Sequence, residues 1–126
     1  MVDIEKHISY WRNSADEDWE VANQLISARK IRHGLFFLHL TLEKILKAHV
    51  CSQTQDIAPR VHNLVRLAEL SGIEFSQQQR DLLADMSPLN IEGRYPEMWG
   101  ATLTVKDAED LRRKTEELFE WLKNLL

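Results

Sequence analysis

Three polar side chains recur at intervals of one helical turn in the middle of this sequence. His39, Glu43 and Lys47 are spaced so that, on a helix, each side chain meets the next and can form a hydrogen bond. A histidine in such a set can donate or accept a proton, while the carboxylate orients it. The same spacing also suits a ladder of ion pairs, which contributes only roughly 0.2–0.5 kcal/mol per pair.

A second candidate site lies in residues 90–103, a segment with two glycines that we expect to be irregular. Arg94 and Tyr95 stand directly before Pro96, and the residue before a proline is held in an extended conformation. A guanidinium fixed in a loop is a good fork for a phosphate. Arg94 could equally tie its loop to a helix carboxylate such as Glu43, and the sequence leaves both interpretations open.

Two other histidines and the single cysteine are expected to have different roles. His62 falls where a short helix should begin, and its imidazole either caps that helix or points into a cleft. His49 lies on an apolar stripe and is expected to be a core histidine. Cys51 lies at a helix end without a nucleophile motif, so we expect an inert, partly buried thiol. With no glycine-rich phosphate loop, zinc-spaced set or HExxH motif in the sequence, we expect neither a metal nor another cofactor.

The apolar pattern predicts the helices that position these residues. A first stripe predicts a helix of about 25 residues ending near Ser27, and a second runs from Leu35 to Val50. Because their connection is short, the two should pack antiparallel. Three more helices are expected around the stripes Val61 to Ala68, Leu82 to Leu89 and Val105 to Leu125.

Local signals mark the ends of the later helices. Gly72 is a suitable stop, Ser76 and Thr104 are capping-box starts, and Pro88 should perturb the fourth helix. The expected fold is all-α, a five-helix up-and-down bundle with three long and two short helices. It forms a single domain over residues 1–126.

Composition restricts the classes of function. With 126 residues, 16 Lys and Arg and 20 Asp and Glu, the net charge of -4 argues against a protein that coats nucleic acid irrespective of sequence. Residues 29–66, however, hold seven basic and two acidic side chains. This segment either attracts an anion or pairs with its acidic neighbours across the bundle. One cysteine and no long apolar run predict a cytoplasmic protein without a membrane span.

Aromatic side chains off the main stripes allow two interpretations. They belong either to a wide core face or to a dimer seam. These residues are Trp19, Phe36, Phe37, Phe119 and Trp121.

Three blocks of the sequence together resemble the HEPN family (higher eukaryotes and prokaryotes nucleotide-binding). They are HLTLEKILKA from His39, His62-Asn63-Leu64, and Arg94-Tyr95-Pro96 a short distance after Asn90. They occur in the family's order and cover nearly the whole chain. The resemblance implies a five-helix bundle that usually forms a homodimer, in a bacterial or archaeal protein. It also implies pairing with a small nucleotidyltransferase in a toxin–antitoxin system.

The resemblance further implies binding of nucleotide or RNA. We expect the anion site to comprise Arg94, Tyr95, Lys44, His39 and His62, with Glu43 and Asn90 in structural or orienting roles. Catalytic members of the family are metal-independent endoribonucleases with an Arg-x4–6-His motif. That motif is absent from its usual late-helix position here, although Arg32 and His39 match it by count and would share a helix face. The alternative function is a non-catalytic, dimeric helical interaction or scaffold module.

Overall fold

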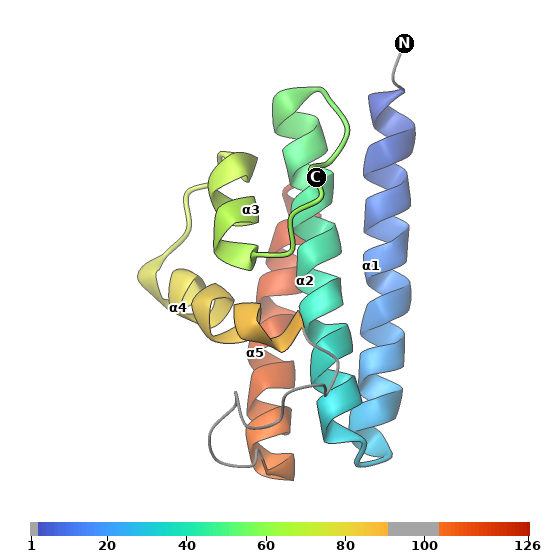
Figure 1. Cartoon of the computed structure of the whole chain (residues 1–126), viewed down its shortest axis with the longest axis vertical. Coiled ribbons are helices and arrows are strands. Elements are labelled where there is room, and N and C mark those ends of the chain that lie inside the picture. The colour runs from blue at the N-terminus through green and yellow to red at the C-terminus, as the bar shows by residue number, and fades with distance from the viewer. Residues whose placement is uncertain (1–2, 91–103) are drawn as a thin grey trace.

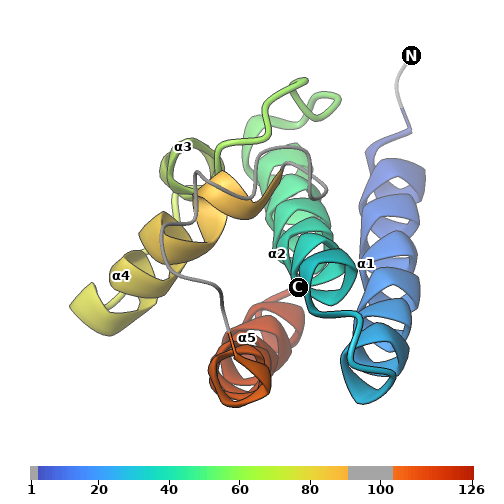
Figure 2. The same ribbon diagram turned by 60° about the horizontal axis from the view of Figure 1, so that its bottom comes forward.

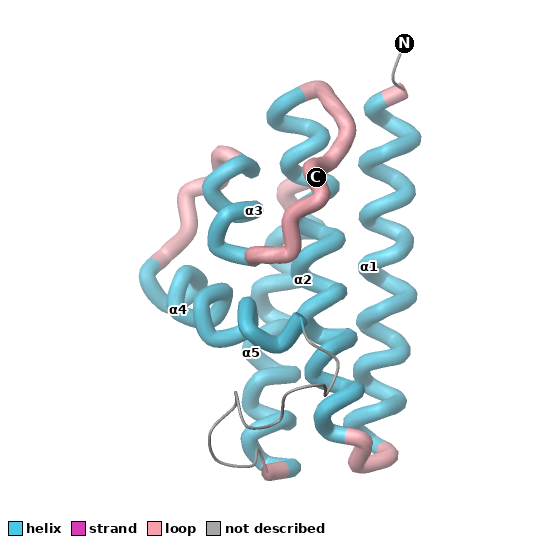
Figure 3. Tube along the Cα trace, in the orientation of Figure 1, coloured by secondary structure: helices cyan, strands magenta, loops and turns pink. Residues whose placement is uncertain are grey.

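In the part of the chain that the structure describes, three long helices form the main bundle and two short helices cover one side of it (Figure 1). The computed structural model describes residues 3–90 and 104–126. In these ranges Figure 3 shows helices joined by short loops. The elements are α1 (Ile4–Ser27), α2 (Ile31–Thr54), α3 (Leu64–Ser71), α4 (Gln77–Met86), the 3-10 helix η1 (Ser87–Asn90) and α5 (Val105–Asn124). The predicted all-α fold with three long and two short helices is confirmed.

The helices α1 and α2 form the predicted antiparallel hairpin. Residues 28–30 join them, and Arg29 takes a left-handed conformation with φ of 62°, which ends the first helix. Just beyond the turn the two backbones lie close together. A Cβ placed on Gly34 would come within 2.5 Å of the Ile26 Cγ1, so only glycine fits there.

Helix α2 occupies the centre of the bundle, with α1, α5 and the α3–α4 pair around it (Figure 2). Fourteen of its 24 residues are buried, so its polar side chains must find partners inside the protein. His49 does so by donating from Nε2 to the Leu122 carbonyl of α5 at 2.8 Å. The expectation of a core histidine is therefore confirmed, and α2 is fastened to the end of α5.

Helices α3, α4 and α5 begin or end at residues whose side chains or backbone conformations suit a helix terminus. Asn63 caps α3, whose end is the left-handed Gly72 with φ of 72°. Complete capping boxes start α4 at Ser76 and α5 at Thr104, as predicted. Pro88 lies in η1, where the α-helix has tightened to a 3-10 turn.

The off-stripe aromatic residues divide between core and surface. Phe119 is fully buried and its ring lies 5.9 Å from that of Trp19, so these two serve the core. Trp121 is 36 % exposed on α5. Of the helices in the described part of the chain, none has the length and apolar character that crossing a membrane requires.

Candidate functional site

A buried carboxylate on α2 gathers three basic side chains around it. Glu43 is only 4 % exposed, and its oxygens lie 3.2 Å from the Nζ of Lys47 and 3.2 Å from the Nδ1 of His62. The Nδ1 of His39 lies 3.6 Å away, beyond a good hydrogen bond. We call His39, Glu43, Lys47 and His62 the Glu43 cluster. It joins the predicted ladder on α2 to a histidine from a distant loop.

His62 reaches the cluster because it stands just outside α3. Its neighbour Asn63 is the N-cap and accepts a hydrogen bond from the Arg66 N–H at 3.0 Å. The imidazole of His62 is therefore not the cap, and it points to Glu43 instead. The side chain remains 64 % exposed, and its Nε2 has no hydrogen-bond partner in the described residues. His62 thus presents Nδ1 to a buried carboxylate, while most of its side chain is exposed.

His39 is the inner member of the cluster. It has no exposed surface, and burial lowers its pKa to about 4 despite the nearby Glu43 carboxylate. It is therefore neutral at physiological pH. Neither ring nitrogen makes a hydrogen bond of good geometry among the described residues, although the backbone of His62 lies close enough to act on the pKa of the ring. In this arrangement His39 has no direct access to a ligand in solvent.

Lys47 neutralises Glu43 and links the cluster to α1. Its Nζ lies 5.1 Å from the centre of the Trp11 ring, a distance that allows a cation–π interaction. The sequence pattern placed Trp11 only on an apolar stripe. The missed signal is the hairpin register, because Trp11 and Lys47 lie equally far from Arg29 along the chain. In an antiparallel hairpin that turns at residue 29, such residues come to lie opposite each other.

Lys44 lies on another flank of α2, where it is already paired. Its Nζ contacts the Asp18 carboxylate at 2.7 Å and the Ser14 hydroxyl at 2.8 Å, both on α1. Asp18 is itself buried, so this pair fixes the register of the hairpin. The structure therefore pairs Lys44 with Asp18 of α1, which compensates its charge.

The remaining candidates are distributed as follows. Arg94 and Tyr95 lie outside the described residues, as does the side chain of Asn90, which ends η1. Arg32 lies in the first turn of α2, on the same helix as His39. Cys51 is buried, and burial raises the pKa of its thiol, which fits an inert cysteine.

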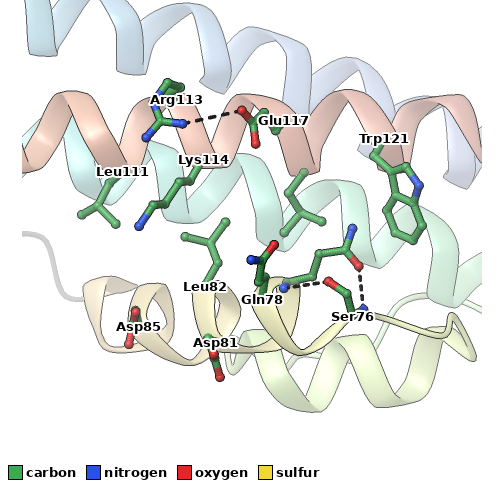
Figure 4. A pocket seen from close by; sticks show the side chains of 12 residues that line it. Ser76, Gln78, Asp81, Leu82, Asp85, Leu111, Arg113, Lys114, Glu117 and Trp121 are labelled. Atoms are coloured by element: carbon green, nitrogen blue, oxygen red, sulfur yellow. Dashed lines mark hydrogen bonds and ion pairs between the residues drawn. The ribbon is translucent and has the colours of Figure 1, made fainter.

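A groove between α4 and α5 is separate from the Glu43 cluster. It encloses about 590 Å³. Figure 4 shows Leu82 and Leu111 facing each other across it, with Trp121 at one end. Its rims are of mixed charge: α4 contributes Asp81 and α5 contributes Arg113, which pairs with a neighbouring glutamate. With charges of both signs, the groove has no preference for an anion.

The chemistry of the Glu43 cluster is that of an oriented imidazole. Glu43 holds the Nδ1–H of His62, which leaves Nε2 either to accept a proton or, when protonated, to donate to an anion. Lys47 compensates the carboxylate, so the ring is not facing an excess of negative charge. No three His, Cys, Asp or Glu side chains in residues 3–90 and 104–126 are arranged to hold a metal ion.

A long helical hairpin, two short covering helices and a closing long helix, with a buried carboxylate between one buried and one exposed histidine, define a HEPN-type helical domain. Residues 8–125 match the family model of the HEPN domain, and this chain belongs to that family.

Two solved structures share the fold. TT1696 from Thermus thermophilus aligns with a TM-score of 0.80 at 14% identity, over 94% of this chain and 98% of that one. ST0689, described as an archaeal HEPN homologue, aligns with a TM-score of 0.65 at 20% identity, over 94% and 96%. No curated protein sequence matches this chain at a significant level.

Proposed function

We propose that this HEPN protein binds nucleotide or RNA through a phosphate contact made by His62. The observation that carries the proposal is the hydrogen bond from the exposed His62 to the buried Glu43 at 3.2 Å. An exposed histidine normally samples several rotamers, and ordering it on binding costs free energy. Because the hydrogen bond to Glu43 already orders the His62 ring in the free protein, less free energy is lost when Nε2 contacts an anion.

The electrostatics of α2 support an anionic ligand. Lys47 cancels the charge of Glu43, and Lys44 cancels that of Asp18. With these charges compensated, a phosphate that approaches His62 does not meet an unpaired carboxylate. The expected site also includes Arg94 and Tyr95 of the Arg-Tyr-Pro block that resembles the family's. In this proposal the Arg94 guanidinium binds the phosphate.

We propose that the site binds RNA or nucleotide and does not cleave RNA. The sequence lacks the Arg-x4–6-His motif in its late-helix position. His39, the histidine of the count-matched pair with Arg32, has no exposed surface. We propose further that the chain acts as a homodimer with a small nucleotidyltransferase as partner, in the manner of a toxin–antitoxin pair. Family membership and the resemblance of its motif blocks support this partnership.

A binding titration tests the phosphate contact. Calorimetry with AMP and ATP, and fluorescence anisotropy with a labelled single-stranded RNA, should show binding by the unmodified protein and weakening in His62→Ala. A histidine–phosphate contact is a charge-assisted hydrogen bond of roughly 1.5–3 kcal/mol, so weakening by about tenfold to a hundredfold is expected. His33→Ala is the matched control, because His33 is exposed at the start of α2, away from Glu43. Equal affinities for the two variants would contradict the proposal and favour the scaffold alternative.

The proposed assembly is tested separately. Light scattering should give a dimer mass. Co-purification from the native host should recover a small nucleotidyltransferase. A monomer that recovers no such protein would contradict this part of the proposal.

A further inference from the structure

An exposed tyrosine, Tyr10, contacts the half-buried Trp11, whose ring lies against Lys47 of the Glu43 cluster. Tyr10 on α1 is 61 % exposed. Its ring meets that of Trp11 at 5.0 Å and 77°, an edge-on contact. Whichever ring supplies the edge, such a contact leaves at least one face of Tyr10 uncovered. Most of the Tyr10 side chain is therefore open to solvent beside the Trp11 ring.

Trp11 connects this pair to the proposed phosphate contact. Its ring lies 5.1 Å from the Nζ of Lys47, and that Nζ lies 3.2 Å from Glu43. Glu43 in turn lies 3.2 Å from His62. An unbroken series of contacts therefore joins the exposed tyrosine to the exposed histidine.

The position of Tyr10 on its helix places it on the flank of α1 that α2 approaches. Ser14 lies one helical turn after Tyr10, so the two share a face of α1. The Ser14 hydroxyl accepts a hydrogen bond from Lys44 of α2 at 2.8 Å. Tyr10 thus borders the α1–α2 seam on the side from which the lysines of α2 reach across.

We propose that Tyr10, backed by Trp11, is a stacking platform for a nucleobase, so that the ligand of this site is an unpaired nucleotide of single-stranded RNA. This inference rests on the proposed function, in which His62 contacts a phosphate. Every base offers a π-face, and stacking on an aromatic side chain tolerates any sequence. In a duplex the bases are stacked on one another, and single strands are the usual targets of aromatic side chains. The phosphate contact holds the strand, and stacking on Tyr10 favours an unpaired base over a paired one.

Other exposed apolar side chains lack this connection. Ile57 is aliphatic, and Leu125 and Leu126 end the chain beyond α5. Trp121 packs against Phe75 and borders the groove between α4 and α5, where the rim charges are mixed. It supplies a matched control, because it is an exposed aromatic residue remote in sequence and contacts from the Glu43 cluster.

The experiment compares fluorescence anisotropy of a labelled single-stranded RNA with that of the same RNA annealed to its complement. The unmodified protein should bind the single strand more tightly. Tyr10→Ala should weaken binding of the single strand by about fivefold or more, because base stacking is worth roughly 1–3 kcal/mol. Tyr10→Phe, which keeps the ring, should bind like the unmodified protein, and Trp121→Ala should leave the affinity unchanged. Circular dichroism confirms that each variant is folded.

The outcomes separate the two proposals. If the protein binds single-stranded RNA and His62→Ala weakens binding while Tyr10→Ala does not, the phosphate contact stands and the stacking platform is overturned. Equal affinity for single strand and duplex also overturns the platform. If the protein binds neither RNA nor mononucleotides, the proposed function fails and this inference fails with it.

Discussion

Glu43 on α2 accepts a hydrogen bond from His62, nineteen residues further along the chain, at 3.2 Å. Between the two lie the end of α2 and the loop that leads to α3. Because Glu43 is buried and fixed on a helix, the hydrogen bond pins the loop as well as the imidazole. A single carboxylate therefore sets both the path of the chain and the orientation of the exposed histidine.

Removal of Glu43 should be strongly destabilising. Glu43→Ala leaves the Lys47 ammonium, only 7% exposed, without its counter-ion. Breaking a buried ion pair in this way costs roughly 3–5 kcal/mol of unfolding free energy. Urea denaturation measures the loss. Glu69→Ala, at an exposed pair with Arg66, is the control and should change stability by less than about 1 kcal/mol.

The double variant Glu43→Leu with Lys47→Met distinguishes a charge effect from a packing effect. When both charges are replaced by apolar side chains of similar size, no uncompensated ion remains in the core. Most of the stability lost in Glu43→Ala should then return in the same urea experiment. A double variant as unstable as the single one would contradict this account.

Stability should fall in mildly acidic solution because of His39. Its pKa is about 4 in the folded protein, against 6.5 for an unperturbed histidine. Between these values the unfolded chain binds the proton more readily, so the unfolding free energy rises with pH. The contribution of neutral His39 to the unfolding free energy is complete above pH 6.5. It decreases as the pH falls towards 4, by about 3 kcal/mol in all.

The variant His39→Leu isolates this contribution. Its unfolding free energy, measured in urea between pH 7 and pH 4, should depend on pH less steeply than that of the unmodified protein. His33→Leu removes an exposed histidine and should retain the original slope. Parallel curves for all three proteins would show that His39 does not control the acid sensitivity.

Gly34→Ala should loosen the hairpin. The added methyl would lie 2.5 Å from the Ile26 Cγ1 and 3.3 Å from the Ile26 backbone nitrogen, and Ile26 is buried. Overpacking of this kind costs roughly 1–3 kcal/mol, which exceeds the gain from replacing glycine within a helix. The thermal midpoint should therefore decrease. An increased midpoint would mean that the helices separate here at little cost.

His49→Leu should weaken the attachment of α5 to α2. The substitution deprives the Leu122 carbonyl of its 2.8 Å hydrogen bond inside the core. An unsatisfied buried acceptor costs roughly 1–3 kcal/mol. Urea denaturation should show this loss in His49→Leu, and His33→Leu again serves as the exposed control. Unchanged stability would indicate that another donor replaces the imidazole.

Local signals in the sequence were sufficient for most of the fold. The capping boxes at Ser76 and Thr104 depend only on residues three positions apart, and the apolar stripes depend only on helical periodicity. The core role of His49 followed from its place on a stripe. These features were predictable because each arises within one helix.

The candidate site required information that no single helix contains. The ladder of His39, Glu43 and Lys47 was visible as a spacing, but the spacing did not distinguish a buried cluster from an exposed row of ion pairs. For His62, the sequence offered two equal roles, and Asn63 decided between them by taking the cap. The position of Trp11 beside Lys47 depends on the register of the α1–α2 hairpin.

The sequence by itself therefore determined the number of helices, the end of α3 at Gly72, the starts of α4 and α5 and the antiparallel pairing of the first two helices, because these follow from interactions over a few residues. Only the tertiary structure decided that Glu43 is buried and that His62 is drawn to it, since burial depends on which helices cover α2. The tertiary structure also brings Asp18 to Lys44, so that the charge of this lysine is compensated. The chemistry of a side chain is set by its partners in space, and the sequence specifies those partners only through the complete fold.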